Sequence, residues 1–269
     1  ITSKNEAVLR YIYYCLNTLP NELVGGDHKR QWISNFSNKK IPIPPLPVQL
    51  EIVRILDNFT ELTAELTAEL TARKKQYEYY RDELLTFKDG EAEWKTLGEV
   101  INLQRGRRLV KSQLEETGKY AVYQNAMTPL GYYHESNVKA YTTFIICAGA
   151  AGEIGFSDVD YWAADDVHSC ITPDNINNRF LYYYFKTQQQ KILSQVRRAS
   201  IPRLPKTVLE KLSIPIPPLK EQERIVAILD KFDTLVNDIS SGLPAEIDER
   251  QKQYEYYRDK LLTFKELGA

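Results

Sequence analysis

The sequence predicts an α+β chain in which a globular domain of short strands and helices is joined to a long, coiled-coil-like pair of helices. One segment occurs twice, at 41–88 and again at 214–265, and both copies carry an amphipathic helical pattern. Between the copies, short apolar runs alternate with polar turns, as strands do. Near-identical helical segments in one chain can pack as a pseudo-symmetric pair, so the repeat predicts the helical spacer and the intervening region predicts the globule.

The first copy carries one long helical stripe. Apolar and aromatic residues between Val48 and Lys88 recur three or four positions apart, with one gap of seven, at Ile52, Leu56, Phe59, Leu62, Leu66, Leu70, Tyr77, Tyr80, Leu84 and Phe87. A helix over this segment would span roughly 60 Å at about 1.5 Å per residue. The preceding IPIPP cannot be helical, because each proline forces extended geometry on the residue before it, so we expect a rigid lead into the helix.

The centre of this helix is a tandem of a four-residue TAEL unit. It reads LTAELTAELTA at 62–72 and consists mainly of strong helix formers, with leucine at every fourth position. Adding or deleting one unit would change the length by about 6 Å and the rotation by about 40° without breaking the apolar stripe. The segment is therefore predicted to tune distance.

The second copy is interrupted where the first carries TAEL. It reads DTLVNDISSGLPAEIDERQ at 233–251, and glycine and proline inside a helix cost about 1 and 3 kcal/mol. We expect two helices here, about Glu221–Ile239 and Ala245–Lys265. The QYEYYRD blocks of the two copies also place tyrosines at helical spacing, and we expect these to meet one another in the core of the helix pair, with base stacking as the alternative. They are Tyr77, Tyr80, Tyr254 and Tyr257.

Residues 94–213 predict the globular domain. The strand candidates are GEVINLQ, YAVYQN, TTFIICAGA and HSCITP, and a helical pattern follows from Arg179 to Val196. The repeat copies then form two helical spacer regions at 41–93 and 214–269, the second interrupted near 240–244.

Residues 1–40 are predicted to be the C-terminal part of another such domain. ITSKNEAVLRYIYYCLN at the start of the chain resembles ITPDNINNRFLYYYFKT at 171–187, and both stretches lead to IPIPPL. Trp94 to Cys170, 77 residues, have no counterpart upstream. We therefore expect the parent chain to carry at least that much more before Ile1.

Composition excludes several classes of protein. The 269 residues are 43% apolar with a formal net charge of −1. The chain contains no run of about 18 apolar residues, so the sequence predicts no membrane-spanning helix. Three cysteines without a CxxC or Cys/His spacing predict reduced, buried thiols and argue against zinc. With no signal peptide in the sequence, we expect a cytoplasmic protein.

Catalytic patterns are sparse. The chain has no P-loop and no GxSxG motif, and AGAAGEIG at 148–155 is interpreted as a tight turn because no clear helix follows it. The isolated polar residues are interpreted as structural or coincidental and not as a metal site: His134, His168, Asp158, Asp160, Asp165 and Asp166. We predict no catalytic residue and no metal ligand.

Positive charge is distributed unevenly along the chain. Val100–Ser112 holds four cations and no acid, and Arg179–Lys211 holds eight cations against one glutamate. Two acid-poor basic segments in one domain predict a phosphate-binding surface. Amides such as Gln124 and Asn125 pair with adenine, while small apolar groups contact thymine methyls. The predicted DNA-binding residues are Arg105, Arg107, Arg108, Lys111, Gln124, Asn125, Thr128, Arg197, Arg198, Ser200, Arg203 and Lys206.

Each of these residues also has a plainer interpretation. A turn cap explains Gln124 and Asn125 as well as base contact does. Surface solubility explains the arginines taken singly. Their concentration in two loops of one domain is what favours DNA.

These motifs together resemble the specificity subunit of type I restriction–modification systems, in particular the type IC group. The resemblance covers essentially the whole chain and rests on WKTLGEV, SIPRLPKTVLEKL, IPIPPL before EQERIVAILDKF, and above all TAEL with QKQYEYYRDKLLTF. It implies two target recognition domains that each read half of a bipartite DNA sequence, separated by two antiparallel helical regions whose TAEL number sets the gap. It also implies a non-catalytic chain, here without most of its first recognition domain, whose remaining domain at 94–213 reads one half-site.

The resemblance further implies the partners. Two modification subunits, which are S-adenosylmethionine-dependent adenine methyltransferases, dock on the helices, and restriction subunits driven by ATP with Mg²⁺ complete the enzyme, while the chain itself binds no cofactor. Two other hypotheses stay open: a coiled-coil scaffold protein without DNA specificity, and a stand-alone enzyme that modifies DNA.

Overall fold

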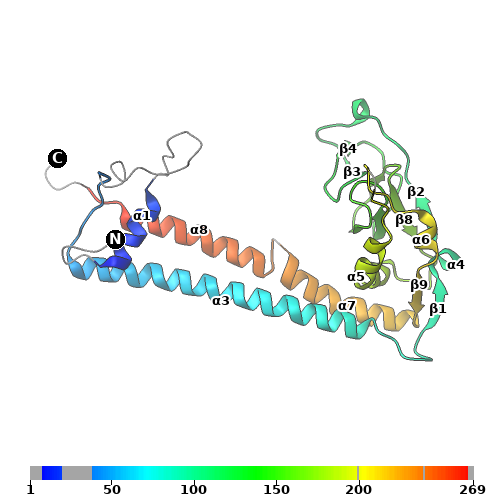
Figure 1. Ribbon diagram of the computed structural model, residues 1–269, viewed down its shortest axis with the longest axis horizontal. Helices are drawn as coiled ribbons and strands as arrows, with labels where there is room; N and C mark the ends of the chain where they lie inside the picture. Colours follow the sequence, from blue (N-terminus) through cyan, green and yellow to red (C-terminus); the bar gives the residue numbers. More distant parts are fainter. Residues whose placement is uncertain (1–7, 20–37, 199, 239, 266–269) are drawn as a thin grey trace. The chain divides into compact units, whose positions relative to one another are not determined.

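The computed structural model describes residues 8–19, 38–198, 200–238 and 240–265. The chain divides into two compact units, which we call the helical unit (Ile1–Lys74 with Thr234–Ala269) and the sheet unit (Lys75–Asp233). The predicted mixture of short strands and long helices is confirmed (Figure 1).

The predicted domain boundaries follow the sequence repeat and stay predictions. They are 1–40, 41–93, 94–213 and 214–269. Of the first of these, residues 1–7 and 20–37 lie outside the described residues.

The predicted long helix is present as α3 (Leu46–Leu84), whose 39 residues begin two positions earlier and end four positions earlier than expected. Pro47 lies in its first turn, where the missing N–H costs no helical hydrogen bond. The TAEL threonines Thr63, Thr67 and Thr71 each donate a hydroxyl hydrogen bond to the carbonyl four residues earlier, at 2.9, 2.7 and 2.9 Å. No residue from 62 to 72 is buried. This segment therefore supplies helix but little core, which is why a change in its length would cost little packing.

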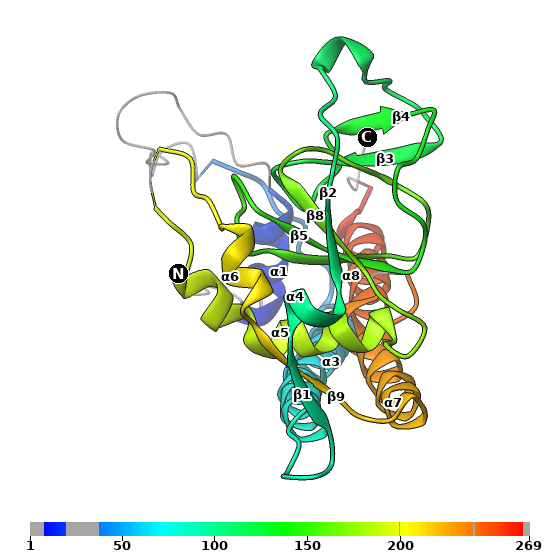
Figure 2. The ribbon, with the colours of Figure 1, turned by 90° about the vertical axis from the view of Figure 1, so that its right-hand side faces the viewer.

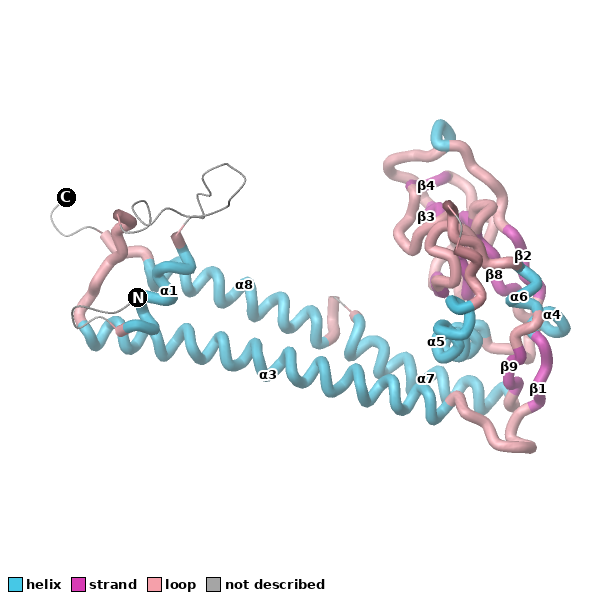
Figure 3. Tube along the Cα trace, viewed as in Figure 1, coloured by secondary structure: helices cyan, strands magenta, loops and turns pink. Residues whose placement is uncertain are grey.

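The predicted interruption of the second copy is also confirmed. Helix α7 (Leu219–Asn237) and helix α8 (Leu243–Leu262) are separated by a short loop, drawn in pink in Figure 3. The carboxylate of Asp238 accepts hydrogen bonds from the backbone N–H and the hydroxyl of Ser240, at 2.7 and 2.6 Å, and these and Ser241 lower its pKa to about 2. A Cβ on Gly242 would lie 2.5 Å from the carbonyl oxygen of Thr234, so the backbone approach at this loop requires glycine.

The core of the helical unit joins three helices. Ile52 and Leu56 of α3 pack with Leu262 of α8 and with Tyr11, Tyr14 and Cys15 of α1 (Leu9–Thr18). Tyr254 packs against the edge of this cluster.

The predicted contacts among the four tyrosines are wrong in their partners. Tyr257 stacks on Phe59 in the helical unit, with ring centroids 5.5 Å apart, and Tyr80 stacks on Phe232 in the sheet unit at 5.7 Å. Tyr77 is buried near the same Phe232 ring. Each tyrosine block meets the ILDNF or ILDKF segment of the other copy, because antiparallel pairing aligns the end of one copy with the start of the other.

The two units repeat one further set of contacts. In the helical unit, Arg10 Nε donates to Asp57 Oδ1 at 2.8 Å and the Tyr14 hydroxyl donates to the same oxygen. In the sheet unit, Arg179 Nε and the Tyr183 hydroxyl donate to Asp230 Oδ1 at 2.8 and 2.5 Å. Helix α1 therefore docks on α3, and α5 docks on α7, through the same three kinds of side chain.

The sheet unit contains three small sheets. Their strand orders are β2-β8-β5-β6, β4-β3-β7 and β1-β9. The strands are β1 (Glu93–Thr96), β2 (Asn102–Arg105), β3 (Tyr120–Tyr123), β4 (Gly131–Tyr133), β5 (Thr142–Ile146), β6 (Ile154–Ser157), β7 (Trp162–Ala163), β8 (Val167–Ile171) and β9 (Ser213–Ile216). The remaining helices are α4 (Leu97–Val100), the 3-10 helix η1 (Lys111–Gln113), α5 (Asn178–Ser194) and α6 (Lys206–Glu210).

Most of the predicted elements of this unit are present. The runs YAVYQN, TTFIICAGA and HSCITP form β3, β5 and β8, and the predicted helix from Arg179 is α5, which packs against β5 and β6 (Figure 2). The run GEVINLQ is only half strand: its first residues form α4, because the Glu99 carboxylate accepts a hydrogen bond from the Thr96 N–H at 2.7 Å and caps that turn. The run SIPI at 213–216 forms β9, one of several strands that the sequence did not predict. It pairs with β1 in a two-stranded sheet, so Pro215 costs no inner ladder bond.

Two further predictions concern the whole chain. Cys15, Cys147 and Cys170 are buried free thiols, as expected. Among the described helices, none is both long and apolar enough to cross a membrane.

Candidate nucleic-acid interface

The first basic loop begins where β2 ends. Arg105 is the last residue of β2 and lies opposite His168 of β8 in the antiparallel register. Its Nε donates a 2.9 Å hydrogen bond to the backbone carbonyl of Asp165. The next two residues keep the loop on the sheet, since Gly106 N–H donates to Val167 O at 3.0 Å and Arg107 N–H donates to Ala163 O at 2.9 Å.

This close approach requires glycine at position 106. A Cβ there would lie 2.2 Å from the Ala164 carbonyl oxygen and 2.3 Å from that of Ala163, which is far inside van der Waals contact. We expect Gly106→Ala to displace the loop and to lower the free energy of unfolding of the sheet unit by about 1–3 kcal/mol. Urea unfolding followed by tryptophan fluorescence checks this, because Trp162 Nε1 donates to the Arg107 carbonyl at 2.8 Å and reports on the loop.

The matched control is Gly131→Ala, where the nearest atom to a new Cβ is Leu114 Cβ at 3.3 Å. This change should cost well under half as much. An unfolding midpoint for Gly106→Ala equal to that of Gly131→Ala would contradict the steric argument.

The second basic loop runs from Arg197 to Lys206 and closes on itself. Arg197 and Arg203 exchange backbone hydrogen bonds of 2.9 and 3.1 Å. The Leu204 N–H donates to the Cys147 carbonyl at 2.8 Å, just after the end of β5. The first basic loop starts where β2 ends, and the second is bonded just after the end of β5, so both meet the same end of the β2-β8-β5-β6 sheet. We call this end the sheet edge.

The third predicted group is the amide loop, which consists of Gln124, Asn125 and Thr128 and follows β3. Asn125 accepts a 2.9 Å hydrogen bond at its carbonyl from the Ala150 N–H, and Gly149 N–H donates to the Pro202 carbonyl at 3.1 Å. The turn at 148–152 thus contacts both the amide loop and the second basic loop. The predicted tight turn is present at 148–152, whereas Ile154 and Gly155 of the same run begin β6. The turn contacts two of the three predicted groups.

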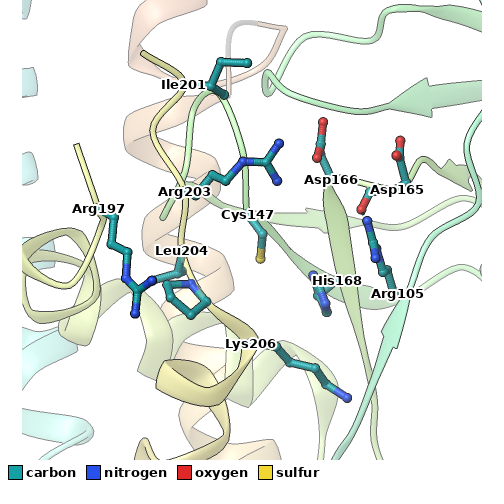
Figure 4. Close-up of a pocket in the computed structure, with 11 residues that line it drawn as sticks. Arg105, Cys147, Asp165, Asp166, His168, Arg197, Ile201, Arg203, Leu204 and Lys206 are labelled. Carbon is teal, nitrogen blue, oxygen red and sulfur yellow. Dashed lines mark hydrogen bonds between the residues drawn. The ribbon is translucent and has the colours of Figure 1, made fainter. Parts of the chain in front are cut away.

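A cavity of about 600 Å³ lies where the two basic loops meet the sheet edge (Figure 4). It is lined by Arg105, Cys147, Asp165, Asp166, His168, Arg197, Ile201, Arg203, Leu204, Pro205 and Lys206. Four predicted DNA-binding cations, from two segments more than ninety positions apart, are therefore brought together. Figure 4 shows the Arg203 guanidinium extending toward Asp166, with Arg105 beside Asp165.

The other predicted residues do not line this cavity. Arg198 lines a second cavity of about 630 Å³ with Gly149 and Pro202. Seven predicted residues line neither cavity, and all of them are exposed except the half-buried Gln124: Arg107, Arg108, Lys111, Gln124, Asn125, Thr128 and Ser200.

Three polar residues of the cavity were not predicted to be functional. Asp165, Asp166 and His168 were interpreted as coincidental or structural, and they line the cavity because β2 pairs with β8. Burial lowers the pKa of His168, and the nearby cations Lys206 and Arg105 lower it further, so the imidazole is neutral near pH 7. The adjacent aspartates just before HSCITP could have drawn attention to this part of the chain. However, the pairing of β2 with β8, which places them near Arg105, cannot be deduced from the sequence.

The cavity also contains unmatched hydrogen-bonding groups. Among the described residues, Asp165 Oδ1 and His168 Nδ1 are buried side-chain atoms without a hydrogen-bond partner. Leaving such an atom unpaired costs free energy. A site with four cations, two carboxylates and two unpaired buried atoms is therefore suited to a polar ligand that both donates and accepts hydrogen bonds.

Comparisons with known proteins agree on one family. The family model described as "Type I restriction modification DNA specificity domain" matches residues 1–73 and 90–249. The EcoR124I/EcoR124II type I restriction enzyme specificity subunit of Escherichia coli is 43% identical over 97% of this chain and 72% of that protein. A putative type I restriction enzyme specificity subunit of Haemophilus influenzae is 37% identical over 98% of this chain and 74% of that protein.

Solved structures show the same fold. The type I restriction–modification S subunit of M. genitalium superimposes with a TM-score of 0.71 at 20% identity, covering 97% of this chain and 74% of that one. The HsdS subunit of Thermoanaerobacter tengcongensis gives a TM-score of 0.58 at 18% identity, covering 94% of this chain and 69% of that one.

Proposed function

Because the chain belongs to the family of type I restriction–modification DNA specificity subunits, we propose that its sheet unit reads one half of a bipartite double-stranded DNA target. The chain is the non-catalytic, DNA-recognition component of its system. The observation that carries the half-site proposal is the convergence of the two basic loops on one sheet edge, beside the turn that contacts the amide loop. Such an array combines phosphate-binding cations with side chains that reach base edges.

We assign the exposed loop cations to the phosphates and the amide loop to base edges. Arg107, Arg108 and Lys111 lie outside the cavity, where long cationic side chains suit backbone phosphates. Gln124 and Asn125 present amides, which pair with adenine in the major groove. The phosphate contacts would position the domain, and the amides with the cavity residues would provide the specificity.

We further propose that two modification subunits dock on the helices and that restriction subunits complete the enzyme. Tyr79 and Tyr256 occupy equivalent positions of the two QYEYYRD blocks and are among the most exposed large side chains, at 64% and 61%. Exposed tyrosines are typical anchors of protein interfaces, and equivalent anchors suit two copies of one partner. In this proposal S-adenosylmethionine, ATP and Mg²⁺ bind to the partner subunits, and the complex acts in the cytoplasm.

The test is to coexpress the chain with its modification subunit and to map methylated adenines across the genome. We expect one methylated motif that contains a half-site set by residues 94–213. Loss of that motif when the sheet unit is exchanged for one with different loops would support the assignment. Methylation without any defined motif would refute it and favour a scaffold without DNA specificity.

The same assay tests the TAEL segment as a ruler. Inserting one further TAEL unit after Leu70 adds about 6 Å of helix in a segment where no residue is buried, so packing should be kept. We expect the two parts of the methylated motif to keep their bases while the gap between them lengthens. A gap that stays the same after the insertion would rule out the ruler proposal.

A further inference from the structure

We propose that the cavity between the two basic loops reads a G·C base pair of the half-site, with Asp165 accepting from the cytosine amino group and Arg203 donating to guanine. This inference rests on the proposed function and specifies its chemistry. It assigns a recognition role to an acidic residue that charge alone would exclude from a DNA interface.

The first argument is the mixed charge of the cavity. Arg105, Arg203 and Lys206 share its wall with Asp165 and Asp166. Carboxylates repel a phosphate, so a site for the DNA backbone would hold the cations without the acids. Cations and carboxylates side by side suit a ligand that offers acceptors and a donor next to each other, as the edge of a base pair does.

The second argument is the unpaired acceptor. Among the described residues Asp165 Oδ1 is buried and has no hydrogen-bond donor, although the carbonyl of the same residue is bonded to Arg105 Nε. An ionised carboxylate only accepts hydrogen bonds, so the missing partner must be an N–H or O–H group. His168 Nδ1 lies on the same cavity and is also unpaired, in a side chain only 7% exposed.

The third argument is the pattern of the major-groove edge. A G·C pair presents guanine O6 and N7 as acceptors and the cytosine N4 amino group as a donor. Arginine pairs with the guanine acceptors, and a carboxylate accepts from the cytosine amino group. An A·T pair also has one donor, but it brings the thymine methyl group against charged side chains, which is unfavourable. The Arg203 and Asp165 combination therefore matches G·C.

The test uses the complete complex of this chain with its modification subunits. Methylated motifs are mapped for the wild type, for Asp165→Asn and for Asp158→Asn, a matched control that removes the same charge from an exposed residue outside the cavity. We expect Asp165→Asn to lose preference at one G·C position by about tenfold or more while the other positions keep theirs. Asp158→Asn should leave the motif unchanged.

A second measurement needs no variant and so does not depend on how Asp165→Asn folds. Binding of the wild-type complex is compared between duplexes that carry guanine, 7-deazaguanine or inosine at each G·C pair of the half-site. We expect 7-deazaguanine, which lacks the N7 acceptor, to weaken binding about tenfold at one pair. Inosine, which keeps O6 and N7 and loses only the minor-groove amino group, should have no effect there.

The outcomes separate this inference from the proposed function. If the wild-type complex methylates no defined motif, the proposed function fails. If the motif is defined but contains no G·C pair in this half-site, or if its G·C pairs tolerate both Asp165→Asn and 7-deazaguanine, the cavity inference alone is overturned.

Discussion

Replacing Arg105, Arg107 and Arg108 with glutamine is expected to weaken DNA binding by the assembled complex roughly 100-fold at physiological salt. The three side chains are exposed at the start of the first basic loop, and Arg105 also lines the cavity. Each lost phosphate contact should lower the slope of log affinity against log salt by about 0.9. Because Arg107 and Arg108 are the two assigned to phosphates, we expect the slope to fall by roughly two, as measured by fluorescence anisotropy at several salt concentrations.

The matched control removes three arginines from the helices: Arg54, Arg224 and Arg250. Each of these forms an ion pair with a glutamate on its own helix. Replacing them with glutamine changes the net charge by the same amount as the loop variant does, but leaves the basic loops intact. This variant should bind DNA with a nearly unchanged salt slope. If the loop variant and the wild type bind DNA with equal affinity, the first basic loop is not part of the DNA interface.

Replacing Arg179 with alanine is expected to lower the free energy of unfolding of the sheet unit by about 2–3 kcal/mol. Arg179 is 24% exposed and bonds to Asp230 and to Asp233 at 2.8 and 3.2 Å. Burial opposes its charge, but these two carboxylates together raise its pKa and hold it ionised. Its guanidinium also lies over the ring of Phe156, 4.5 Å from the centroid. Truncation would remove the cation that both carboxylates share, and the partial exposure of Asp230 limits the cost.

The repeat provides the control in the same molecule. Arg10 makes the equivalent contact with Asp57 at 2.8 Å, but the two side chains are 48% and 41% exposed. Exposed ion pairs contribute little, so Arg10→Ala should cost at most about 1 kcal/mol. Urea unfolding followed by circular dichroism compares the two variants, and similar costs would show that burial does not distinguish the two clusters.

Much of the candidate site could be predicted from local patterns. Arg105, Arg197 and Arg203 could be predicted because each lies in a basic segment with few acids, which is a feature of phosphate-binding surfaces. The structure brings these three together, whereas Lys111 and Thr128 line neither cavity. Asp165 and His168 could not be predicted as members, because they join the site through the pairing of β8 with β2 and through burial. Both are long-range properties that no local window contains.

The same distinction holds for the helices. Local periodicity predicted α3, and the cost of glycine and proline in a helix predicted the break between α7 and α8. Both depend on residues within a few turns of one another. Local periodicity could not assign partners. Tyr257 stacks on Phe59 because antiparallel packing decides which turn faces which.

The sequence by itself determined the repeat, the long helices, four of the described strands and the family, since these follow from local propensity and from the order of motifs. Only the tertiary structure decided which predicted cations share a cavity and that two aspartates and a buried histidine share it with them. The reason is physical: strand pairing and loop closure join residues that are far apart in the chain, and the charge of a site depends on all the groups that meet there.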